Sequence, residues 1–117
     1  MKTTKNIKFS DLIPTANLIR QLYWRAYFRL KFGEEEDEKV IFTLSEKPKK
    51  YEMSPVQIME IINEAIDTLD PFCKQIIKIE LLQIESAPTY WYLSYVSRST
   101  YYRYRKEAYV KFISYFK

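Results

Sequence analysis

The side chains best suited to binding chemistry in this 117-residue sequence are concentrated near its C-terminus. Residues 97–106 read Ser-Arg-Ser-Thr-Tyr-Tyr-Arg-Tyr-Arg-Lys, a run of hydroxyl groups and cations that contains no carboxylate. Arginine can donate a pair of hydrogen bonds to guanine, and serine or threonine hydroxyls can contact base edges or phosphates. A helix that began here would also present its N-terminal amide groups to a phosphate. The stretch therefore favours contact with nucleic acid.

The elements around this stretch are expected to present it as a helix-turn-helix. Residues 90–95 indicate a short helix, Val96-Ser97 a turn, and the residues from Arg98 towards Phe116 a longer basic helix, which is the order of that motif. Ser97 is placed to cap the final helix. The simpler alternative is a basic amphipathic helix that only closes a bundle.

Within this final helix, position predicts a role for each side chain. Side chains near the helix start should approach base edges, and cations further along should meet the phosphate backbone. We expect base contacts from Arg98, Ser99, Thr100 and Arg103, a phosphate contact from Ser97, and backbone contacts from Arg105, Lys106 and Lys111. The inward face should contain Tyr101, Tyr104 (or Arg105), Ala108 and Phe112.

The stretch from Ser97 to Ala108, ahead of Phe112, resembles the end of the ArpU and RinA group of phage transcriptional regulators. Their C-terminal half is similar to region 4 of bacterial sigma factors. Residues 66–72 and 90–93 fit as well, so the resemblance covers about residues 54–117. It implies activation of late phage genes and adds Tyr102 to the DNA-facing residues Arg98, Ser99, Thr100 and Arg103. The usual glycine of the turn is absent, and Tyr95-Val96 stands there.

Composition argues against most catalytic classes. The chain has no histidine and a single cysteine, Cys73, which removes histidine bases, a disulfide within the chain and a zinc site of nitrogen and sulfur ligands. The acidic run of residues 34–38 lacks the ligand spacing of a calcium loop, and a solvated charge run is the simplest interpretation. Cation binding or mimicry of nucleic acid by this run stay as alternatives. We therefore expect no enzyme activity, cofactor, metal or small-molecule substrate.

Charge is segregated along the chain. Residues 1–33 carry seven Lys/Arg and one acid, and residues 88–117 carry six Lys/Arg and one acid. Residues 34–50 have a net charge of −2 and residues 51–87 one of −5. Basic ends can place positive potential where a polyanion docks. No apolar run approaches the roughly 20 residues that span a bilayer, and no secretion signal is evident, so we expect a soluble intracellular protein without membrane contact. The resemblance implies that its location is the cytoplasm of a bacterial host cell.

The chain should be mainly α, a small helical bundle ending in the helix-turn-helix, because one glycine and five prolines suit long helices with short connections. Three segments are expected: a basic and aromatic helical segment over residues 1–33, an acidic linker with a short β element over residues 34–53, and the helix-turn-helix domain over residues 54–117. Residues 1–10 should form a polar arm. The first helix should begin at Asp11–Pro14 and end at Gly33, the second should run from Ser54 to Asp70, and the third from Pro71 to about Ile84. The β element should be a strand at residues 39–44 followed by a loop at residues 45–50.

The first helix has three interpretations. Trp24, Tyr27 and Phe28 could form a partner surface, since aromatic residues with arginine are enriched at interfaces. Arg20, Arg25 and Arg29 could instead add contacts to a DNA backbone, or the helix could simply cover the core. Double-stranded DNA is the expected partner, with RNA polymerase and a second copy of the chain left open. The rival function is a protein-interaction module of a phage or mobile element that modulates a transcription factor or polymerase.

Overall fold

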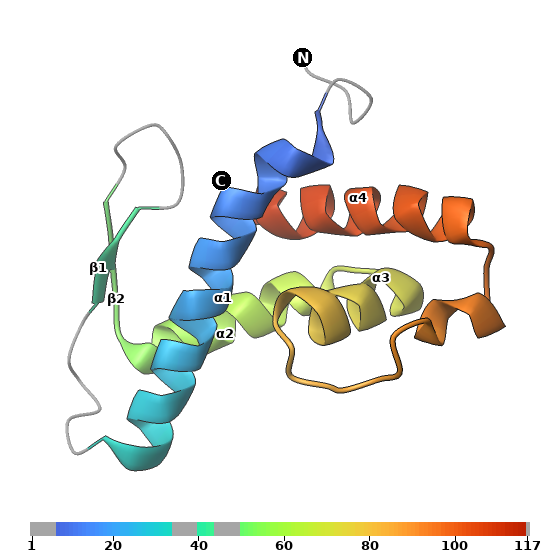
Figure 1. The fold of residues 1–117 in the computed structure, drawn as a ribbon. Coiled ribbons are helices and arrows are strands. Elements are labelled where there is room, and N and C mark those ends of the chain that lie inside the picture. The colour runs from blue at the N-terminus through green and yellow to red at the C-terminus, as the bar shows by residue number, and fades with distance from the viewer. Residues whose placement is uncertain (1–6, 34–39, 44–49, 117) are drawn as a thin grey trace.

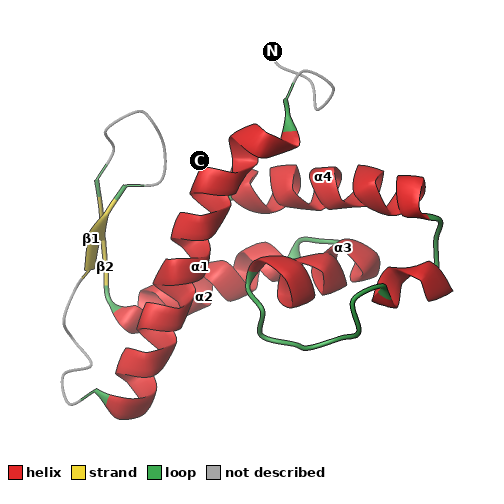
Figure 2. Cartoon of the chain, viewed as in Figure 1, coloured by secondary structure: helices red, strands yellow, loops and turns green. Residues whose placement is uncertain are grey.

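The structure is a computed structural model that describes residues 7–33, 40–43 and 50–116. It is a helical bundle with one small sheet (Figures 1 and 2), which confirms the predicted fold class. The acidic run of residues 34–38 and most of the predicted loop at residues 45–50 lie outside the described residues. In order, the elements are α1 (Phe9–Phe32), β1 (Val40–Phe42), β2 (Tyr51–Met53), α2 (Pro55–Asp67), α3 (Pro71–Ile76), the π-helix η2 (Ile77–Leu81), the 3₁₀ helix η3 (Trp91–Ser94) and α4 (Arg98–Ser114).

Three helices begin at the residues that the capping rules predict. At α2, the Ser54 hydroxyl accepts a hydrogen bond from the Gln57 backbone N–H at 3.2 Å, and the Gln57 side chain accepts one from the Ser54 N–H at 2.8 Å. At α3, Asp70 accepts from the Cys73 N–H at 2.9 Å, and at α4, Ser97 accepts from the Thr100 N–H at 3.3 Å. Each cap satisfies a backbone donor that the helix itself cannot pair.

The first helix begins earlier than predicted. Residues Phe9 and Ser10 belong to α1, and Pro14 lies inside the helix on its exposed side, so the predicted arm over residues 1–10 is wrong at its end. The cause is tertiary, because the Phe9 ring packs against Tyr109 of α4 with centroids 4.8 Å apart. Two apolar side chains of the first two helices are exposed: Leu18 of α1 by 41% and Val56 of α2 by 43%.

The predicted helix from Pro71 to Ile84 is broken into two kinds of helix. α3 ends at Ile76, and the Leu82 N–H then donates to the Ile77 carbonyl at 2.9 Å, five residues back. This wider turn aligns residues five apart, so the pairs 76–77 and 81–82 are both buried. The segment ends at Gln83, which has a positive φ of 57°.

The small sheet is an antiparallel hairpin that closes one end of the core. Val40 pairs with Met53 and Phe42 with Tyr51, so the strand expected within residues 39–44 exists and has a partner strand. The rings of Phe42 and Tyr51 stack at 5.3 Å. The Tyr51 hydroxyl donates to the Phe116 carbonyl at 2.9 Å, which connects the hairpin to the C-terminal end of the chain.

The helices share one hydrophobic cluster. It contains buried residues of α1, α2, α3, η2, η3 and α4, and no polar or charged residue is buried among those described. The described residues of the three predicted segments therefore meet in a common core. Figure 1 shows α4 running alongside α3 and reaching α1 at its far end. Within the described ranges, no helix is long and apolar enough to cross a membrane.

Candidate nucleic-acid interface

Two aromatic contacts and two buried side chains fix the rotation of α4. Tyr101 is 2% exposed and its ring stacks on that of Tyr92 in η3, with centroids 3.6 Å apart and planes 6° from parallel. Tyr104 packs edge-on against Phe72 of α3 at 5.3 Å. Ala108 and Phe112 are fully buried further along. The inward face of the helix is therefore the predicted one, and its opposite face is turned to solvent.

The outward face of α4 carries a group of polar and basic side chains that we call the basic face: Arg98, Ser99, Tyr102, Arg103 and Lys106. The first four are exposed and Lys106 is half-buried. Within the described part of the chain, neither arginine nor Lys106 is within ion-pair distance of a carboxylate. The first carboxylate of α4 is Glu107, which binds Lys111 at 2.9 Å. The face is therefore positively charged and acid-free.

The remaining predicted residues have contacts within the protein. The Ser97 hydroxyl, besides capping α4, donates to the Thr100 hydroxyl at 3.0 Å and lies 3.4 Å from that of Ser99. Arg105 is engaged by side chains within the protein. Its guanidinium lies 3.9 Å from a Glu80 carboxylate oxygen, 4.1 Å from the centre of the Phe9 ring and 4.7 Å from that of Tyr102. The contact of Arg105 with DNA stays a prediction, and Arg105 would have to leave these partners to make it.

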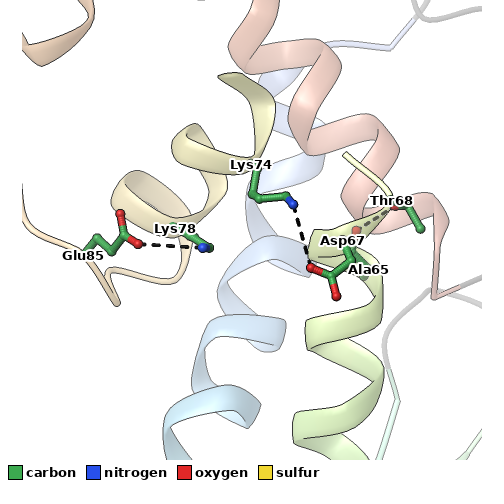
Figure 3. A network of polar contacts seen from close by, with 6 residues as sticks. All are labelled: Ala65, Asp67, Thr68, Lys74, Lys78 and Glu85. Atoms are coloured by element: carbon green, nitrogen blue, oxygen red, sulfur yellow. Dashed lines mark hydrogen bonds and ion pairs between the residues drawn. The ribbon is translucent and has the colours of Figure 1, made fainter. Parts of the chain in front are cut away.

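Cations on neighbouring elements are paired with acids. Lys74 of α3 lies 3.8 Å from Asp67, and Lys78 of η2 lies 3.7 Å from Glu85 (Figure 3). The same view shows Thr68 at the end of α2, where its hydroxyl donates to the Ala65 carbonyl at 2.7 Å. These pairs neutralise the lysines of α3 and η2, so the unpaired positive charge of this half of the protein is concentrated on α4.

The turn before α4 forms without glycine. The expected short helix at residues 90–95 is the 3₁₀ helix η3, and the N–H groups of Tyr95 and Val96 both donate to the Tyr92 carbonyl, at 2.9 and 3.0 Å. Tyr95 has φ −118°, a conformation open to any L-residue. The absence of the usual turn glycine therefore has a local explanation, because the turn contains no left-handed residue.

Sequence reasoning missed a group of exposed apolar side chains beside this turn. Tyr90 is 56% exposed, Leu93 48% and Tyr95 74%. The Arg98 guanidinium lies over the Tyr90 ring at 5.3 Å. Beneath Tyr95, an open groove runs between α3 and residues 85–95. The density of aromatic residues at 90–95 is the sequence signal, but the groove depends on Phe72 of α3, which no local pattern connects to Tyr95.

The predicted partner residues of α1 divide into two kinds. Trp24 is half-buried, and its indole N–H donates to the Leu82 carbonyl at 2.7 Å, which anchors α1 to the end of η2. Tyr27 is also half-buried, and Lys31 donates to its hydroxyl at 3.2 Å. Phe28 is 52% exposed, and Phe32, which sequence reasoning did not select, is 70% exposed. Their rings stack at 6.0 Å.

Titratable groups of the core are unsuited to nucleophilic chemistry at neutral pH. Burial raises the pKa of the Cys73 thiol to about 12 and that of Tyr109 to about 12. Burial, together with the nearby Glu80 carboxylate, also raises the pKa of Tyr101. No group of three histidine, cysteine or acidic side chains that could hold a metal ion occurs among the residues described.

Comparison with known proteins gives no significant match: no family model, no curated protein and no solved structure matches this chain. The resemblance of residues 54–117 to the ArpU and RinA regulators therefore stays a prediction from the sequence.

Proposed function

We propose that this protein binds double-stranded DNA through the basic face and regulates transcription. The observation that carries the proposal is an exposed helix surface with two arginines, a lysine, a serine and a tyrosine, and with no acid in ion-pair range within the described residues. Cations of this kind neutralise phosphates, and arginine near a helix start can reach guanine in the major groove. The stacked Tyr92–Tyr101 pair and the Ser97 cap support the fixed presentation that sequence reading requires.

The biological setting follows from the sequence resemblance. Activation of late phage genes, with RNA polymerase as a second partner and the host cytoplasm as the location, is the form of the proposal that the ArpU and RinA likeness favours. A homodimer on paired half-sites is compatible with this form.

Selection of a binding site from random duplexes tests the proposal. A sequence should emerge that binds at least about 10³-fold more tightly than random DNA, the lower end of specific recognition. On that sequence, Arg103→Ala should cost about 1–3 kcal/mol if Arg103 reads a base. Failure to enrich any sequence, with no preference over random duplex, would refute sequence-specific binding.

The rival function, a protein-interaction module, is favoured by the exposed Phe28 and Phe32 rings. Phenylalanine has no polar group to offer a sugar-phosphate backbone, so these rings fit a protein partner better than DNA. Phe28→Ser with Phe32→Ser should abolish binding of such a partner and leave DNA affinity unchanged. Loss of DNA binding in this variant would place the α1 face in the DNA site.

A further inference from the structure

The groove beneath Tyr95 is lined by residues that can bind a planar aromatic ligand. Its aromatic lining consists of Phe72, Trp91 and Tyr95, with the Phe72 centroid 5.7 Å from that of Trp91 and 6.5 Å from that of Tyr95. Ile79 and Pro88 complete the apolar surface. The volume of the groove is about 740 Å³, within the roughly 300–1,000 Å³ of small-molecule pockets. Size therefore does not exclude a planar ring from this groove.

The rim of the groove offers neutral hydrogen-bonding groups. The side chains of Gln75, Ser86 and Ser94 line it, and an amide and two hydroxyls can both donate and accept hydrogen bonds. Glu85 also lines the groove, and its charge is opposed by Lys78 at 3.7 Å. Such a rim can contact the edge of a nucleobase without placing an unopposed negative charge beside a phosphate.

The groove adjoins the basic face. Tyr95 precedes Arg98 by three residues, and Arg98 lies over the ring of Tyr90 at 5.3 Å. An arginine next to exposed aromatic rings is the arrangement that binds single strands, because the cation meets the backbone and the rings stack on bases. Bases inside a duplex are already stacked on each other and present only their edges, so they cannot stack on these rings.

We propose that Tyr90, Tyr95 and the groove bind unpaired nucleobases adjoining the duplex that lies on the basic face. The ligand class of this site is thus a nucleic acid with a duplex segment next to an unpaired stretch. The inference rests on the proposed function for its duplex part. The side chains that stack on the bases are different from those that contact the duplex, so the two parts can be tested separately.

The test compares three fluorescent DNA ligands at one salt concentration by anisotropy. They are a fully paired duplex, the same duplex with a single-stranded thymidine extension at either end, and the extended strand alone. The extension should raise affinity. Tyr95→Ala should lower the affinity for the extended duplex by about 5- to 140-fold, the worth of one stacked base, and leave the paired duplex unaffected. Tyr95→Phe, which retains the ring, is the matched control and should behave like the wild type.

Trp91 gives a second readout, because a base that enters the groove should quench its fluorescence. The extended duplex should quench the wild type, and Trp91→Phe should remove that quenching. If the protein bound the single strand but not the paired duplex, the stacking of unpaired bases would be supported, and both the proposed function and the duplex part of this inference would be refuted. Equal affinity with and without the extension, or an extension effect that survives Tyr95→Ala, would overturn the inference alone. If no oligonucleotide quenched Trp91, the inference would also be overturned, and a protein segment would be the remaining candidate ligand of the groove.

Discussion

The proposed DNA binding has a salt dependence that can be worked out from the basic face. Arg98, Arg103 and Lys106 are its three cations, and none is within ion-pair distance of a carboxylate in the described ranges. If each neutralises one phosphate, log K should fall with log salt with a slope of about −2.7. Between about 50 and 200 mM salt, that slope lowers the affinity roughly 40-fold.

Removal of one cation should change the slope by a known amount. Arg103→Ala leaves two phosphate contacts, so the slope should fall to about −1.8 and the same salt step should cost roughly 12-fold. Arg25→Ala is the matched comparison and also tests the alternative that α1 contacts the DNA backbone, because Arg25 is an exposed arginine of α1 on a helix whose C-terminal half lies far from the start of α4 (Figure 1). This variant should leave the slope unchanged.

Fluorescence anisotropy at four or more salt concentrations measures these slopes. A slope near −3.6 in the wild type would mean that Arg105 leaves Glu80 and joins the interface. An unchanged slope in Arg103→Ala with lower affinity would assign Arg103 to a base instead of a phosphate. An unchanged slope with unchanged affinity, or an equal loss in Arg25→Ala, would refute the assignment of the contact to the basic face.

Three further predictions concern the structure that supports this face. Tyr101→Phe should change the free energy of unfolding by about 1 kcal/mol or less, because the buried hydroxyl lies near the Glu80 carboxylate without a hydrogen bond of good geometry. Tyr101→Ala should cost about 3–5 kcal/mol in a urea melt, and a strongly destabilised Tyr101→Phe would contradict this reasoning. Asp70→Ala should cost about 1 kcal/mol at neutral pH. The hydrogen bond from the Cys73 N–H holds the pKa of Asp70 below its usual 3.8. The stabilisation is therefore present above pH 3.8 and is lost as the pH falls through the lower pKa of the folded state. The difference in the free energy of unfolding between the wild type and Asp70→Ala should therefore disappear in acid. Burial raises the pKa of Cys73 to about 12, so a thiol reagent at about pH 8 should label it only after unfolding; rapid labelling of the folded protein would show that the core opens.

The parts of the fold that depend on local rules were predictable. Ser54, Asp70 and Ser97 each cap a helix through a contact three residues ahead, and such contacts are visible in a sequence. The early start of α1 was not predictable, because it depends on Phe9 packing against Tyr109, one hundred residues later. The π-helix also follows from the core, where the residues near Ile77 and Leu81 must face inward together.

The candidate site divides in the same way. The exposure of Arg98 and Arg103 follows from helical spacing, since Tyr101 and Ala108 define the opposite face. The position of Arg105 does not, because its contacts with Glu80 and Phe9 come from two other helices. Spacing allowed this position to point either way, and tertiary contacts decided it. The groove likewise required residues from α3 and from the turn before α4.

The placement of Arg105 between Phe9 and Tyr102 determines which truncated forms of the chain can keep this packing. Its guanidinium lies over one ring from the start of α1 and over another that belongs to the basic face. Removal of α1 would remove the Phe9 ring from Arg105. It would also remove the hydrogen bond from Trp24 to the Leu82 carbonyl at the end of η2. Residues 54–117 are therefore not expected to fold as an independent unit. Any chimera that borrows the last helix must also import the first, or supply a substitute for Phe9.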